Sequence, residues 1–269
     1  MAKTHEGFCR ICGNFGPLSF EHIPPRAAFN NRPVMVANLD VAMKLGPDEI
    51  AKGPIQQRGM GAYTLCYRCN NDTGGWYGKR FVDWCYQGMH ILQMAQGKPS
   101  LIYINYLFPL SILKQIITMF FTVNGVQFRK ANPELVEFVL NKEKMYLSPK
   151  YRVFVYYNIE GRFRTVGGAA ITNLNKGGKP ISLSEISFPP FGYMITFGSN
   201  PPDDRLFEIK HFARYDYSEW TPMELKLPVL PTHLAIPGDY RTKDEIDKQY
   251  QENMEQEKRM QANIRPSKR

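Results

Sequence analysis

Two pairs of cysteines, each pair separated by two residues, form the clearest chemical pattern in this sequence. Cys9 and Cys12 make the first pair, and Cys66 and Cys69 make the second. Two intervening residues let both sulfurs of one tight turn reach a single ion at about 2.3 Å, and two such turns complete a tetrahedral structural zinc site. A thioredoxin-type redox pair would follow a strand in a βαβ unit, and neither pair has that context. We therefore predict a structural Zn²⁺ held by four thiolates; the alternative is two unrelated pairs of reduced cysteines.

The residues around these pairs resemble a known family. Glu21 and His22 precede Ile-Pro-Pro between the two pairs, and Asn70 directly follows Cys69. The series C-x-x-C, acid–His–Ile–x–Pro and C-x-x-C-Asn is similar to the zinc-stabilised subset of the HNH endonucleases, over roughly residues 7–80. This resemblance implies a beta-beta-alpha metal finger, in which His22 is the general base and Glu21 and Asn70 hold a catalytic divalent ion.

These residue types suit phosphodiester hydrolysis. The reaction needs a deprotonated water, and a neutral imidazole with a pKa near 6.5 can accept that proton at physiological pH. A hard ion such as Mg²⁺, bound by the carboxylate of Glu21 and the amide oxygen of Asn70, keeps positions for water and phosphate oxygens. The zinc would be purely structural, because four thiolates close its coordination sphere.

The sequence departs from the family pattern in two places. Glu21 stands where Asp is usual, which lengthens the metal-binding side chain by one methylene. The family's middle residue, an Asn that supports the base from about five positions before the second cysteine pair, is replaced by Gly61. Arg58, Asn38 or Gln57 could replace it only with a different geometry. The segment between His22 and Cys66 is also long, which suggests an added substrate-contacting loop.

Three basic residues flank the expected cleft and are candidate phosphate contacts: Arg26, Lys79 and Arg80. An ordinary solvated basic surface is the alternative. The formal charge of +9 favours a polyanionic partner, since cationic side chains release counter-ions from nucleic acid.

Composition limits the class of protein. With 43% hydrophobic residues in 269, the chain can bury a large core. No run reaches the roughly 18 apolar residues of a membrane span, and the first residues contain no apolar signal core, so we expect a cytoplasmic protein without a membrane partner.

We expect an α+β fold in three parts. Residues 1–95 form the HNH-like zinc module, with a strand at 18–23 and a helix at about 70–93. Residues 96–240 form a mainly antiparallel accessory domain, in which 152–157 and 162–166 read as a hairpin around an Asn-Ile-Glu-Gly turn. Residues 241–269 form a charged helix and a basic tail. The accessory domain or this helix could join a second copy or a partner protein.

The sequence therefore predicts an HNH-type endonuclease that acts on DNA. Two alternatives remain open at this point: a catalytically silent zinc module that binds nucleic acid or a protein partner, and a nuclease that acts on RNA. By family resemblance, its biological setting would be phage defence or restriction.

Overall fold

The computed structural model describes residues 5–172 and 178–264, and the predicted basic end at 265–269 lies outside them. Its first part contains a three-stranded antiparallel sheet in the order β1-β2-β5, followed by helices. The elements here are β1 (Glu6–Phe8), β2 (Phe15–His22), β3 (Val34–Met35), α1 (Leu39–Ala42), β4 (Ile55–Gln56), β5 (Gly61–Cys66), α2 (Tyr67–Thr73), η1 (Gly74–Gly78) and α3 (Lys79–Met94). The predicted strand and helix are both present.

The predicted long helix contains a π-helical turn. Gly74 and Gly75 begin η1, which lies between α2 and α3 without interrupting the helical path. Glycine lacks a Cβ and loses more conformational freedom in a helix than any other residue, so this pair weakens regular α-helical geometry. The predicted helix is therefore present with one irregular turn near its start.

The second part is built on a five-stranded antiparallel sheet in the order β11-β7-β10-β9-β8. Its strands are β7 (Tyr151–Tyr157), β8 (Arg164–Thr172), β9 (Pro180–Phe188), β10 (Phe191–Phe197) and β11 (Phe207–Glu208). Strands β6 (Tyr103–Leu107) and β12 (Thr221–Leu225) form a separate ribbon. Helices α4 (Pro109–Val123), α5 (Gln127–Ala131), α6 (Pro133–Leu140) and η3 (Lys210–Arg214) complete this part. The expected mixed α+β architecture with antiparallel sheets is confirmed.

The predicted hairpin between 152–157 and 162–166 is wrong. Strand β7 pairs with β10 and β11, whereas β8 pairs with β9 at the edge of the sheet. The backbone around the expected turn bonds instead to residues 228–232, because Tyr157 N–H donates to Pro228 O and Arg162 N–H donates to Thr232 O. A distant segment therefore takes the hydrogen bonds that a closed four-residue turn would have used.

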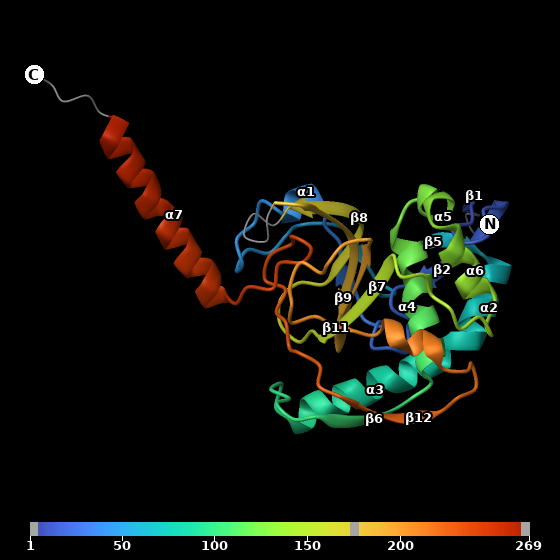
Figure 1. Cartoon of the computed structure of the whole chain (residues 1–269). Coiled ribbons are helices and arrows are strands. Elements are labelled where there is room, and N and C mark those ends of the chain that lie inside the picture. Colours follow the sequence, from blue (N-terminus) through green and yellow to red (C-terminus); the bar gives the residue numbers. More distant parts are fainter. Residues whose placement is uncertain (1–4, 173–177, 265–269) are drawn as a thin grey trace, which may run out of the picture.

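The two parts share one continuous core. Helix α4, buried from Pro109 through Thr122, lies between the zinc module and the five-stranded sheet (Figure 1). One cluster of buried side chains contains Cys9 and Trp84 from the first part and Ile116 and Ile186 from the second. The boundary predicted at residue 95 therefore runs through a common core, which fixes the zinc module against the sheet.

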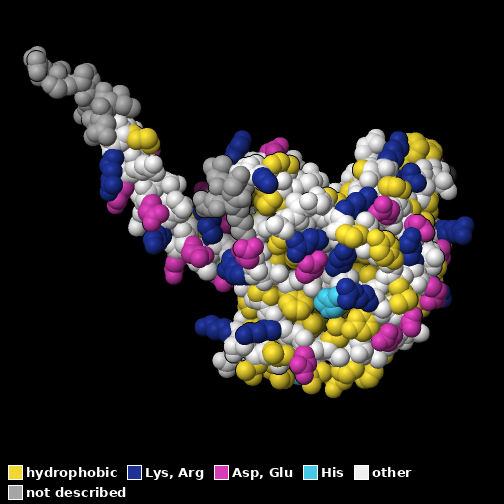
Figure 2. Space-filling view, viewed as in Figure 1, with side chains coloured by type: hydrophobic (Ala, Val, Ile, Leu, Met, Phe, Trp, Pro, Cys, Tyr) yellow, Lys and Arg dark blue, Asp and Glu magenta, His cyan; other side chains and the backbone are white. Residues whose placement is uncertain are grey.

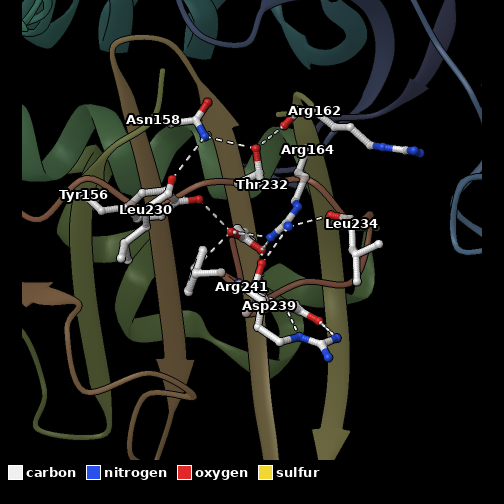
Figure 3. A network of polar contacts seen from close by, with 12 residues as sticks. Tyr156, Asn158, Arg162, Arg164, Leu230, Thr232, Leu234, Asp239 and Arg241 are labelled. Atoms are coloured by element: carbon white, nitrogen blue, oxygen red, sulfur yellow. Dashed lines mark hydrogen bonds and ion pairs between the residues drawn. The ribbon is translucent and has the colours of Figure 1, made fainter. Parts of the chain in front are cut away.

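A buried polar network is centred on Glu185 in β9 of the five-stranded sheet (Figure 3). Glu185 is fully buried, and it accepts hydrogen bonds from Tyr156 Oη at 2.7 Å, Tyr240 Oη at 2.9 Å and the Gly238 amide at 2.9 Å. The Arg164 guanidinium pairs with it at 3.3 Å. Because a buried charge is tolerated only when it is paired and hydrogen-bonded, this network ties residues 238–240 to β8 and β9.

Helix α7 (Lys243–Ile264) extends away from the body of the molecule (Figure 1). Basic and acidic side chains alternate along it (Figure 2), and its apolar residues Tyr250 and Met254 are exposed.

The β6–β12 ribbon also exposes apolar side chains, and its Tyr106 ring stacks on the Trp220 ring with centroids 5.2 Å apart. A partner for either surface stays a prediction. Within the described ranges, no helix combines the length and apolarity that a membrane crossing requires.

Candidate metal and catalytic site

The four predicted cysteines come together at the junction of the first loop, β5 and α2. Their sulfur atoms all lie within 4.8 Å of one another, and the Cys12 and Cys66 sulfurs are 3.8 Å apart. A tetrahedron with Zn–S bonds of about 2.3 Å has sulfur–sulfur edges of about 3.8 Å. The donor set and its spacing therefore fit a four-thiolate zinc site.

Local backbone geometry forms each cysteine turn. In the first, Gly13 adopts φ +81° and its amide donates to Cys9 O at 2.9 Å. In the second, Cys66 is the N-cap of α2, and its sulfur accepts a hydrogen bond from the Cys69 amide at 3.5 Å. Helix N-termini and backbone amides stabilise thiolates, which is the ionisation state that binds metal.

Hydrogen bonding within the cluster shifts the pKa values of its thiols in opposite directions. The pKa of Cys9 is lowered to about 4, chiefly because the Cys69 thiol donates a hydrogen bond to it. The same contact, together with burial, raises the pKa of Cys69. Without an ion the cluster thus concentrates thiolate character on Cys9. A divalent cation would replace the shared proton and stabilise the remaining thiolates.

Residues beyond the module hold the first cysteine turn in place. The Arg129 guanidinium in α5 donates to Ile11 O at 2.9 Å and to Cys12 O at 3.0 Å. Arg10 reaches in the opposite direction and donates to Thr122 O at the end of α4. No sequence pattern pointed to Arg129, since it lies more than a hundred residues from the turn that it supports.

Glu21 and Asn70 meet near the four-cysteine cluster. Strand β2 pairs with β5 so that Glu21 lies opposite Ala62, and α2 begins directly after β5. This path carries Asn70 back to β2, where its Nδ2 donates to Ser19 Oγ at 2.9 Å and contacts Phe20 O at 3.4 Å. No hydrogen bond to Asn70 Oδ1 occurs in the part of the chain described, so this oxygen is available as a metal ligand.

Burial dominates the electrostatics of Glu21. Burial raises its pKa to about 7 from the ordinary value of 4.5, and a hydrogen bond from the Asn70 side chain lowers it only in part. A bound divalent ion would favour the ionised form. Glu21 and Asn70 therefore fit the expected pair of ligands for a hard cation.

His22 follows Glu21 at the end of β2, so their Cα atoms are about 3.8 Å apart. Its ring packs edge-on against Phe20 at 4.9 Å, which places it on the Phe20 side of the strand, while Glu21 faces α2. Its Nε2 lies 3.1 Å from Arg58 O. A carbonyl can only accept, so Nε2 carries the proton and Nδ1 keeps the lone pair that a base needs.

The surroundings of His22 keep the imidazole neutral. Desolvation lowers its pKa from 6.5, the hydrogen bond to the Arg58 carbonyl raises it in part, and the charges of Arg26 and Arg58 lower it further. Both arginine side chains are exposed. His22 is consequently deprotonated at physiological pH, and two cations lie close to it.

The three candidate phosphate contacts differ in their placement. Arg26 is close enough to influence His22. Lys79 is exposed and pairs with Asp83 at 2.8 Å. Arg80 is enclosed between the Phe108 and Tyr217 rings, at 4.3 and 4.2 Å, and donates to Ser111 Oγ at 2.7 Å. Arg80 is thus partly buried, and its guanidinium is engaged by the residues around it.

The structure also shows the surroundings of Gly61, which stands where the resemblance leads one to expect an asparagine. Gly61 lies opposite His22, and a Cβ there would come within 2.3 Å of Glu21 O and 2.6 Å of the Phe20 ring. A side chain at this position would therefore displace the strand that bears both candidate catalytic residues.

Comparisons with protein-family models, with curated proteins and with solved structures give no match to this chain. The site geometry is therefore the basis for the functional proposal.

Proposed function

We propose that this protein is a metal-dependent endonuclease of the HNH type, which hydrolyses phosphodiester bonds in DNA. The observation that carries the proposal is the contact of Glu21 with Asn70 on the side of β2 that faces α2. A neutral His22 follows Glu21 at the same strand end, with its ring on the Phe20 side. The net charge of +9 supports a polyanionic substrate.

Each residue has a defined part in this reaction. His22 takes a proton from the attacking water at Nδ1, while its Nε2–H remains on the Arg58 carbonyl. Glu21 and Asn70 would hold the divalent ion, Mg²⁺ or a similar cation, which when bound would offset negative charge on the phosphate. Arg26 and Arg58 contribute further positive charge beside the scissile group. The four cysteines would hold structural zinc, which keeps β2, β5 and α2 in register.

The first test is a cleavage panel. Purified protein is incubated with plasmid DNA, single-stranded DNA and structured RNA, each with Mg²⁺, Mn²⁺ or Ni²⁺. The proposal expects cleavage of DNA. Exclusive cleavage of RNA would instead establish the RNA nuclease. Binding of DNA without cleavage under any of the three ions would favour the silent zinc module.

A substitution tests the role of His22. We expect His22→Ala to lower the cleavage rate by at least about a hundredfold, the usual contribution of a general base, with zinc content unchanged. His90→Ala is the matched control, because this exposed histidine lies on α3 and not in the site. Retained metal-dependent cleavage in His22→Ala would remove His22 from its proposed role.

A further inference from the structure

We propose that Asn30 is a positioning residue for this site: its side-chain amide fixes the loop that holds the general base. The inference rests on the proposed function for its catalytic part, while the structural contacts of Asn30 stand independently of it. Asn30 follows β2 in a segment whose composition resembles an ordinary surface turn, yet its side chain is fully buried.

The amide of Asn30 uses both of its functional groups. Its Nδ2 donates to Pro24 O and to Met60 O, each at 2.7 Å, and its Oδ1 accepts from the Met60 amide at 2.7 Å. Met60 O also accepts from the Ile23 amide at 3.0 Å. One side chain thereby joins the segment that leaves β2 to the segment that enters β5, and closes the base of the long insertion between them.

The neighbouring backbone is shaped around this contact. Gly59 adopts φ +89°, which favours glycine, and a Cβ there would lie 2.3 Å from Asn30 O and 2.5 Å from its Oδ1. Gly59 and Met60 therefore lie directly on Asn30. Loss of the amide would leave the partly buried N–H and C=O of Met60 without their side-chain partner.

The consequence for the site follows from Arg58, two residues before Met60. Its carbonyl is the acceptor for His22 Nε2 at 3.1 Å, and its charge acts on the same imidazole. Asn30 thus determines where this carbonyl lies, and through it the orientation of the ring. A shift of about 1 Å in such a contact can lower a reaction rate by about a hundredfold.

The chemistry of the contact specifies asparagine. Met60 presents an N–H and a C=O to the same side chain, so the partner must accept and donate at once. Aspartate keeps the shape but, when ionised, places its charge against the carbonyls of Pro24 and Met60. Alanine removes all three hydrogen bonds.

The experiment compares Asn30→Asp and Asn30→Ala with Asn158→Ala. Asn158 is a matched control, because it is also buried and donates to Thr232 Oγ1 at 3.0 Å, but it directly follows β7, far along the chain from the site (Figure 3). Four quantities are measured: amide hydrogen exchange in peptides covering residues 55–62, affinity for Mn²⁺, and kcat and KM on a labelled DNA oligonucleotide.

We expect both Asn30 variants to exchange at least tenfold faster at residues 58–60, with kcat lowered ten- to a hundredfold. KM and Mn²⁺ affinity should stay within twofold of the unsubstituted protein, because Glu21 and Asn70 are untouched. Asn158→Ala should leave exchange at 58–60 and kcat unchanged.

The two proposals can fail separately. Unchanged exchange at residues 58–60 in both Asn30 variants would overturn the clamp, whatever the activity. Faster exchange with unchanged kcat would overturn its role in positioning the base. If the unsubstituted protein cleaves no nucleic acid, the proposed function fails and the catalytic part of this inference fails with it, while the exchange measurement still decides whether Asn30 holds the loop.

Discussion

The raised pKa of Glu21 predicts a specific dependence of stability on pH. In metal-free protein its pKa is about 7, compared with 4.5 in an unfolded chain. The folded state therefore holds this proton more tightly. Its contribution to stability is fully present below pH 4.5 and is lost as the pH rises to about 7 and beyond.

The magnitude follows from the size of the shift. Each pKa unit corresponds to about 1.4 kcal/mol, so the change from 4.5 to about 7 removes about 3 kcal/mol of unfolding free energy by pH 8. Glu21→Gln cannot ionise and avoids this loss. For a chain of this length, we expect a difference in Tm of about 6 °C or more at pH 8 and almost none at pH 4.

The assay is thermal unfolding, between pH 4 and pH 8, of protein that retains zinc and has no other divalent ion added. The control is Glu143→Gln, an exposed carboxylate, which should follow the unsubstituted protein across the range. Added Mn²⁺ or Mg²⁺ should raise the Tm of the unsubstituted protein at pH 8 much more than that of Glu21→Gln. Parallel pH profiles for the unsubstituted protein and Glu21→Gln would refute the view that Glu21 is a desolvated cation ligand.

Three further predictions concern the scaffold. Purified protein should contain about one zinc per chain by elemental analysis, and Cys66→Ser should lose the zinc and unfold at lower temperature, because metal binding contributes directly to folding. Arg129→Ala should speed the loss of zinc to a chelator and lower the free energy of unfolding in denaturant by about 2 kcal/mol. The reason is that two hydrogen bonds to the first cysteine turn are lost. The neighbouring substitution Lys130→Ala should change neither zinc loss nor the free energy of unfolding. Arg164→Ala should cost about 3–5 kcal/mol in the same measurement, because it leaves Glu185 charged and buried without its cation; a loss below 1 kcal/mol would show that this pair is not needed.

Local patterns predicted the parts of the molecule that depend on neighbouring residues. Two cysteines three positions apart can reach one ion only through a tight turn, so the ligand set was readable from spacing alone. Strand alternation predicted β2, and a continuous polar, helix-forming composition predicted α7, because each pattern is set by neighbouring residues along the chain.

Local sequence patterns did not predict the features that depend on residues far away in the chain. The strand at 152–157 and the following strand looked like a hairpin, but residues 228–232 compete for the backbone of the turn, and the two strands lie apart in the sheet. Arg80 was a candidate phosphate contact because it is a basic residue that flanks the expected cleft. In the structure, two aromatic rings from later segments enclose it. Asn30 carried no signal, because its partner Met60 is thirty positions away.

The sequence by itself determined the donor set of the metal module and the identities of the acid, the histidine and the amide. Only the tertiary structure decided how they act: the pairing of β2 with β5 brings Asn70 to Glu21, and the buried Asn30 sets the carbonyl that holds His22. The physical reason is that ligand type and turn spacing are local properties of the chain. Desolvation, hydrogen-bond partners and hence pKa arise only when segments far apart in sequence pack together.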